Sequence, residues 1–132
     1  MIEFFNPSDA PAPGAFSRAT RAAGLVFVSG TGAGNDTGGK PRVGTAGDQT
    51  RWAMENVARI LEAAGSSLDR VVQVTLLLTD PADYHEINAA YVPFFPSGLP
   101  ARHTARFGVP TTAKVAFACI ALAGEPTRSD DE

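Results

Sequence analysis

A stretch with a helical period, residues 46–64, lies between two strand-like runs and constrains the possible folds more than any other part of the chain. Its apolar positions follow one face of a helix, and they are Ala53, Val57, Ile60, Leu61 and Ala64. Asp48 falls in the expected first turn, where a carboxylate suits the helix dipole, and Gly65 supplies a stop. The flanking runs, residues 25–28 and 71–79, are apolar and partly β-branched. Strand, helix and strand in this order predict a helix packed on a sheet.

The other segments predict a second helix and further strands. Asp80 and Pro81 form a helix start, and an apolar stripe at Tyr84, Ile87 and Tyr91 then runs until Pro93. The expected strands are residues 15–20, 25–29, 71–79, 101–109 and 115–123, with a hairpin turn through residues 21–24.

This order, β-β-α-β-α-β-β, predicts one α+β domain over residues 1–132, with one mixed sheet and both helices on the same face. We expect residues 1–13 to form an extended N-terminal segment and residues 125–132 a mobile tail. The second face of the sheet is also apolar at many positions, and the chain has nothing left to cover it. Burial against further copies of the chain is the simplest solution, so we expect an oligomer.

Composition excludes several classes of protein. No run approaches the roughly 18 apolar residues of a membrane span, and the acidic start of the chain does not resemble a secretory signal, so we expect a cytoplasmic protein without a membrane partner. The net charge of −3 argues against a nucleic-acid partner. The single cysteine, Cys119, excludes an intrachain disulfide, and its apolar surroundings predict a buried, structural thiol.

The glycine-rich loop, residues 30–44, contains a near match to a phosphate-binding P-loop that ends in Lys40. Pro41 occupies the position where such a loop needs Ser or Thr, and no helix follows. We therefore interpret the segment as a flexible turn and expect no cofactor. The two histidines, His85 and His103, have no metal-ligand spacing, so we expect no metal site.

Arg102 is the strongest candidate for a functional residue. A proline turn leads into a predicted strand and places this guanidinium at the strand start, opposite in direction to His103. Arginine suits a carboxylate ligand because it offers several hydrogen-bond donors in a fixed plane. An ordinary surface or interface ion pair is the alternative.

Several segments, taken in order, resemble the RidA (YjgF-type) family. They are residues 14–19, 25–30, 56–65, 71–80, 88–91, 94–95 and 100–102. The resemblance implies a chorismate-mutase-like fold and a homotrimer with clefts between subunits. It also implies an imine/enamine deaminase, in which an arginine binds the carboxylate of a small 2-imino or 2-enamino acid, such as 2-aminoacrylate. Water then adds to the iminium carbon and ammonia leaves, giving a 2-keto acid, as in a 2-iminobutanoate/2-iminopropanoate deaminase.

The resemblance carries particular residues over to the substrate site. Arg102 matches the family's arginine, and Ser29 and Asn88 match two further positions at the cleft. Phe16 replaces the family's tyrosine in the first strand, and Thr104 replaces a frequent cysteine.

The closing strand departs further from the family. Its two alternating glutamates, of which the first is thought to handle the attacking water, are Ala116 and Ala118 here. The loss weakens the prediction of an enzyme and motivates an alternative, a non-catalytic member that binds a small carboxylate or a partner protein. RNA cleavage, as claimed for some relatives, finds no support in a net-acidic chain.

Overall fold

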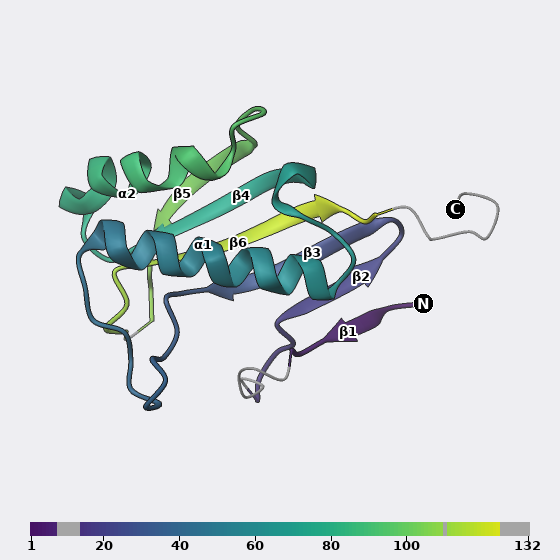
Figure 1. The fold of residues 1–132 in the computed structure, drawn as a ribbon, viewed down its shortest axis with the longest axis horizontal. Coiled ribbons are helices and arrows are strands. Elements are labelled where there is room, and N and C mark those ends of the chain that lie inside the picture. The colour runs from purple at the N-terminus through teal and green to yellow at the C-terminus, as the bar shows by residue number, and fades with distance from the viewer. Residues whose placement is uncertain (8–13, 110, 125–132) are drawn as a thin grey trace.

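The computed structural model describes residues 1–7, 14–109 and 111–124. Within them the chain forms a six-stranded sheet in the order β1-β2-β3-β6-β4-β5, with α1 and α2 on one face (Figure 1). The strands are β1 (Glu3–Phe5), β2 (Ala19–Ala22), β3 (Leu25–Thr31), β4 (Val71–Leu78), β5 (Ala101–Arg106) and β6 (Val115–Leu122). The helices are α1 (Ala46–Ala63) and α2 (Tyr84–Tyr91), with short 3-10 turns at Leu68–Arg70, Pro81–Asp83 and Val92–Phe94.

The sheet is mixed, as expected. Strands β4 and β5 run parallel, and the other neighbouring pairs are antiparallel. The predicted α+β architecture with two helices on one face is therefore confirmed. The part of the N-terminal segment at residues 8–13 and the predicted tail at residues 125–132 lie outside the described residues.

Two details near the N-terminus correct the prediction. Strand β1 was not expected, yet Phe4 pairs with Thr20 and adds an edge strand to the sheet. The hairpin turn is also shorter than predicted, because Ala22 pairs directly with Leu25 and leaves two residues between the strands. Both turn residues have positive φ, 54° at Ala23 and 79° at Gly24, a conformation that suits a two-residue hairpin.

Helix α1 begins at a full capping box. The Thr45 hydroxyl accepts from the Asp48 N–H at 3.0 Å, and the Asp48 carboxylate accepts from the Thr45 N–H at 3.1 Å. These bonds satisfy donors that a helix start leaves open, and the predicted role of Asp48 is confirmed. The predicted apolar stripe is buried against the sheet.

The hydrophobic core lies between the helices and one face of the sheet. Val28, Cys119, Val74 and Arg102 lie opposite one another in successive strands β3, β6, β4 and β5, and so share the helix side. Val74 and Cys119 are buried there, which confirms the buried thiol. Arg102 is the β5 residue on this side. It lies at the edge of the sheet, where a polar side chain can reach water.

The opposite face carries a second apolar surface. Phe27 lies opposite Ile120, and Leu77 lies opposite Ala116. No other element of the described chain packs on this face, and Phe27 remains 39% exposed. Burial against further copies stays a prediction. Within the described residues, no helix is long and apolar enough to cross a membrane.

Candidate functional site

Arg102 is held by three residues of helix α2. Its Nη2 donates to the Tyr84 hydroxyl at 3.1 Å and to the Asn88 side-chain oxygen at 2.8 Å. Its guanidinium carbon lies 4.9 Å from the centre of the Tyr91 ring and 5.7 Å from that of Tyr84. These four residues, with Thr104, are called the arginine cluster below.

The local sequence explains why the cluster forms. Asp80 caps the 3-10 turn that leads into α2, its side chain accepting from the Ala82 N–H at 2.9 Å. Tyr84, Asn88 and Tyr91 then follow at i, i+4 and i+7, which places them on one helical face. The same face meets the start of β5, so the guanidinium enters between the two rings.

Tyr84 has an altered acidity. Hydrogen bonding from Asn88, then hydrogen bonding and the positive charge of Arg102, and finally Thr104, lower the pKa of the Tyr84 hydroxyl below its usual value of 10.0. The phenol oxygen accepts a hydrogen bond from Arg102 Nη2. The cluster thus combines a cation with a hydroxyl that can move a proton.

Tyr91 forms the floor of the cluster. Its ring stacks on Phe117, with centroids 5.6 Å apart and planes 15° apart, and lies 5.0 Å from the Phe95 ring. Its hydroxyl is buried and has no hydrogen-bond partner among the described residues. Desolvation by burial raises the pKa of this hydroxyl. Tyr91 therefore supports Arg102 through its ring.

The other predicted site residues lie away from the arginine cluster, on or beside strands β3 and β6. The Ser29 hydroxyl donates to the Ser17 carbonyl at 2.6 Å, next to Phe16, which is 53% exposed. Ala116 lies on β6, the neighbour of the Ser29 strand, and faces away from the helices because it pairs with Leu77. We call Phe16, Ser29 and Ala116 the serine group.

The two groups do not meet within one chain. Strands β6 and β4 separate β3 from β5, and Ala116 and Arg102 lie on opposite faces of the sheet. A site that uses both groups needs a second copy of the chain. Arg102, Asn88 and Thr104 do come together, whereas Phe16, Ser29 and Ala116 lie elsewhere.

Sequence reasoning missed Tyr84 and Tyr91 as site residues. Both were assigned to an apolar helical stripe, although their spacing with Asn88 was visible. The signal that would have found them is the polar residue inside that stripe, four residues after one tyrosine and three before the other.

The remaining candidates have structural surroundings. Burial raises the pKa of the Cys119 thiol to about 12, which leaves it protonated at neutral pH. His103 points away from Arg102, as predicted, and its Nε2 lies 3.0 Å from the Thr75 hydroxyl. Among the described residues, no three His, Cys, Asp or Glu side chains gather closely enough to hold a metal ion. The glycine-rich loop folds back on itself through an Asn35–Pro41 bridge.

Comparisons with known proteins agree with this fold. A model of the family described as Endoribonuclease L-PSP matches residues 7–123. The mitochondrial protein mmf2 of Schizosaccharomyces pombe is 38% identical over 120 residues, which are 88% of this chain and 94% of that protein. The chloroplastic Reactive Intermediate Deaminase A of Arabidopsis thaliana is 36% identical over 121 residues, 90% of this chain and 65% of that protein. The crystal structure of E. coli TdcF with bound serine is 26% identical with a TM-score of 0.82, and the match covers 92% of this chain and 99% of that one.

Proposed function

Because this chain belongs to the Endoribonuclease L-PSP (YjgF/RidA) family, we propose that it hydrolyses a small 2-imino or 2-enamino acid to a 2-keto acid and ammonia. The observation that carries the proposal is the Arg102 guanidinium, held between two tyrosine rings and fixed by Asn88. The relatives named above include a reactive intermediate deaminase and a protein with bound serine, which carries a carboxylate.

Arg102 is the anchor for the substrate carboxylate. Its Nη2 is engaged by Tyr84 and Asn88, while Nη1 donates to no described residue and keeps its two N–H groups for a ligand. Charge-assisted bonds of this kind are about twice as strong as neutral ones. The hydrogen bonds to Tyr84 and Asn88 of α2 fix the guanidinium before binding, so less side-chain freedom is lost when the substrate binds.

Tyr84 supplies the proton transfer. Its hydroxyl donates a proton to the imine nitrogen, which makes the carbon a better electrophile and leaves a phenolate. Water attacks that carbon, the C–O bond forms, and the phenolate accepts the proton that the water loses. The resulting carbinolamine expels ammonia as its C–N bond breaks, and the hydroxyl proton passes through Tyr84 to the leaving nitrogen. The phenol is regenerated, and no oxidant or metal enters the balance.

The serine group completes the site from a neighbouring copy in this proposal. The uncovered sheet face with Phe27 and Leu77 supplies the apolar contact for a homotrimer. Ala116 then adds an apolar wall near the substrate, which favours a side chain larger than that of 2-aminoacrylate. A cytoplasmic location is part of the proposal, although the names of two relatives refer to mitochondria and chloroplasts.

One specific observation favours the alternative of a non-catalytic carboxylate binder. Both closing-strand positions where the family carries acids are alanine, Ala116 and Ala118. RNA cleavage, named in the family description, is not part of the proposal, because a chain of net charge −3 opposes a polyanionic strand.

A coupled assay separates the two functions. A PLP-dependent dehydratase acting on serine generates 2-aminoacrylate, and lactate dehydrogenase reports pyruvate formation. We expect the wild type to accelerate pyruvate release over buffer and Arg102→Ala to abolish that acceleration. Arg106→Ala is the matched control, because Arg106 lies on the same strand and contacts only the Thr79 carbonyl, at 3.4 Å, among the described hydrogen bonds. If the rate with the wild type equals the rate in buffer alone for a range of imino acids, the result favours the non-catalytic carboxylate binder.

A further inference from the structure

Glu86 of helix α2 binds the N-terminus of helix α1, which lies beside α2 (Figure 1). The Glu86 carboxylate accepts a hydrogen bond from the Gly47 N–H, with Oε2 2.7 Å from the nitrogen. Gly47 lies in the first turn of α1, where the N–H groups have no partner within the helix and carry partial positive charge. Thr45 accepts from the next N–H, that of Asp48, so Glu86 satisfies a donor that the capping box leaves open. A charge-assisted hydrogen bond therefore joins the two helices.

The glycine at position 47 makes room for this contact. The φ of Gly47 is not positive, so the backbone does not require glycine here, and glycine makes a helix less stable than alanine does. A Cβ atom at this position would lie 3.2 Å from Oε2 of Glu86 and 3.5 Å from its Cγ. The absence of a side chain at Gly47 therefore lets the carboxylate of Glu86 reach the end of α1.

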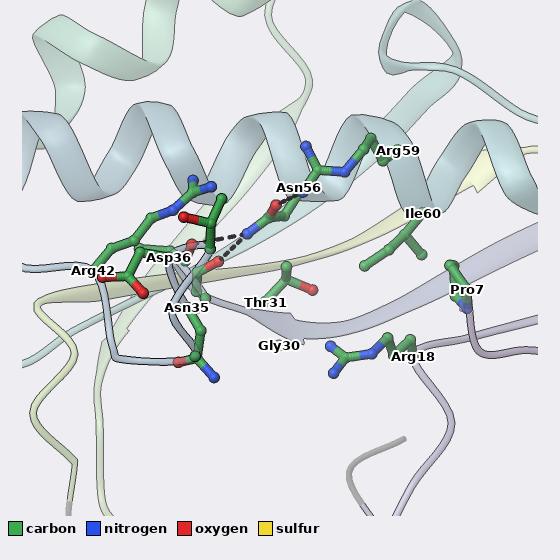
Figure 2. A pocket seen from close by; sticks show the side chains of 15 residues that line it. Pro7, Arg18, Gly30, Thr31, Asn35, Asp36, Arg42, Asn56, Arg59 and Ile60 are labelled. Carbon is green, nitrogen blue, oxygen red and sulfur yellow. Dashed lines mark hydrogen bonds between the residues drawn. The ribbon is translucent and has the colours of Figure 1, made fainter. Parts of the chain in front are cut away.

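Helix α1 is a fixed reference for the position of α2. Near the middle of α1, Asn56 donates from Nδ2 to the Gly32 and Ala33 carbonyls at 2.9 and 3.1 Å, beside the cavity shown in Figure 2. At the C-terminal end, Nη1 of Arg21 on β2 donates to the Ala64 carbonyl at 3.0 Å. Together with the buried apolar stripe, these bonds hold α1 against the sheet. A residue of α2 that binds the end of α1 is thereby tied to the sheet as well.

Glu86 and the residues that hold Arg102 lie on opposite flanks of α2. Successive residues of an α-helix are about 100° apart, and the fully buried Ile87 marks the side of α2 that faces the core. Tyr84 and Asn88 then lie on one flank, where they contact Arg102. Glu86 lies on the other flank, where it contacts α1. Apolar packing is non-directional, so the polar contacts on the two flanks fix the rotation of α2 about its axis.

We propose that Glu86 is a positioning residue of the deaminase site, which binds the N-terminus of α1 and so sets the rotation of α2 that completes the arginine cluster. The inference rests on the proposed function, because its catalytic consequence is a change in the rate of imine hydrolysis. Among the described hydrogen bonds, Glu86 contacts Gly47 and no member of the arginine cluster. Glu86 therefore acts on the cluster through the position of α2.

Two variants of Glu86 and one control variant test this role in the coupled pyruvate assay. We expect Glu86→Ala to lower kcat/KM about tenfold, because a small misplacement of positioned groups can cost up to about 10²-fold. Glu86→Gln keeps a side-chain oxygen that accepts from the Gly47 N–H, and kcat/KM should stay within about threefold of wild type. The matched control is Glu55→Ala, which removes an exposed carboxylate from α1 and changes the net charge equally. Its kcat/KM should stay within about twofold of wild type.

A pH titration of the tyrosinate absorbance gives a second readout, which needs no substrate. The chain has two tyrosines, and the pKa of Tyr84 is lowered whereas that of Tyr91 is raised, so Tyr84 ionises first. Arg102 causes part of the lowering, so a rotation of α2 in Glu86→Ala should raise the pKa of Tyr84 towards 10.0. Deleting a nearby negative charge has the opposite direct effect, since it lowers the pKa of a phenol. The sign of the shift therefore separates an effect of position from an effect of charge.

Three results overturn the positioning role of Glu86. The first is a pKa of Tyr84 that is unchanged or lower in Glu86→Ala. The second is an equal loss in Glu86→Gln and Glu86→Ala, which assigns the effect to charge, and the third is an equal loss in Glu55→Ala. Absence of deaminase activity in the wild type contradicts the proposed function instead, and the tyrosine titration then still decides whether Glu86 positions the arginine cluster. Thermal melts of each variant establish that it is folded under the assay conditions.

Discussion

Replacing Tyr84 by phenylalanine separates proton transfer from substrate anchoring. The change deletes one hydroxyl and keeps the ring, which still lies beside the guanidinium and makes an edge contact with His85 at 5.8 Å. Arg102 retains the shorter of its two bonds, the 2.8 Å contact with Asn88, together with the Tyr91 ring below it. The carboxylate anchor therefore stays in place.

The expected effect falls on kcat. General acid–base catalysis typically contributes about 10²–10⁴-fold. We expect a loss of about 10²-fold, at the lower end, because imines hydrolyse readily with water alone. KM should change less than about threefold, since the interactions that bind the carboxylate in the ground state survive. Steady-state kinetics in the coupled pyruvate assay measure both parameters.

The pH profile gives a signature that a structural role would not. The proposed step needs the protonated phenol, whose pKa lies below 10.0. Wild-type kcat should therefore fall as the pH rises through that pKa, and Tyr84→Phe should lack this alkaline limb. A decrease in kcat of less than about threefold, or an unchanged alkaline limb, would refute the reasoning.

Tyr91→Phe is the matched control for Tyr84→Phe. It deletes a hydroxyl from the second ring beside Arg102 but touches neither of the Nη2 hydrogen bonds. Because the Tyr91 hydroxyl is buried without a described partner, its removal relieves a desolvation cost of about 1–3 kcal/mol. We expect kcat within about twofold of wild type and a raised melting temperature. A loss of kcat equal to that of Tyr84→Phe would show that either hydroxyl merely supports packing.

Four further predictions concern the packing and the electrostatics of the fold. Cys119 should resist alkylation by iodoacetamide at pH 8 in the folded protein and react fully in denaturant, because its pKa is about 12; mass spectrometry measures both. Thr45→Ala should lower the free energy of unfolding by about 0.5–2 kcal/mol through loss of the helix cap, measured by urea denaturation. The Thr45 backbone N–H, with further bonds from Thr45 and Arg51, lowers the pKa of Asp48 below 3.8, so Asp48→Asn should be destabilising at pH 7, and the difference from wild type should vanish as the pH falls through that lowered pKa. Phe27→Arg should dissociate the proposed homotrimer in analytical ultracentrifugation, because it places a charge on the uncovered apolar face; an unchanged sedimentation coefficient would contradict an interface on this face.

The long, periodic segments could be predicted from the sequence because local pattern and tertiary packing agree there. Helix α1 carries a capping signal, an apolar stripe and a glycine stop, and it was placed to within a residue of its observed end. Strand β1 was missed because three residues near several prolines give no usable period. The alternation of a strand would place Val72 on the core face with Val74, yet Val72 is 45% exposed, since the pairing of β4 with β6 shifts between Val71 and Gln73.

The site could be predicted only in part, because its geometry depends on tertiary packing as well as on local sequence. Arg102 and Asn88 could be named from the family resemblance, and the turn before β5 explains how the guanidinium reaches the sheet edge. That Tyr84 and Tyr91 enclose it depends on how α2 packs over β5, which no local pattern encodes. Aromatic residues at helical spacing indicate core positions, whether or not they also contact a site residue.

The arginine cluster and the serine group place the proposed proton transfer on a different element from the family's acids. In the family pattern the acids lie on the closing strand, whose matching positions here face away from the helices, on the same side as Leu77. In this chain those positions are apolar, while a hydroxyl with lowered pKa stands beside the anchor on α2. In the proposed mechanism, the anchor and the proton donor belong to one chain, and a neighbouring copy contributes only shape. Under that proposal, loss of the acids removes one catalytic group but keeps a means of moving a proton, because Tyr84 lies on the opposite side of the sheet from the two alanines.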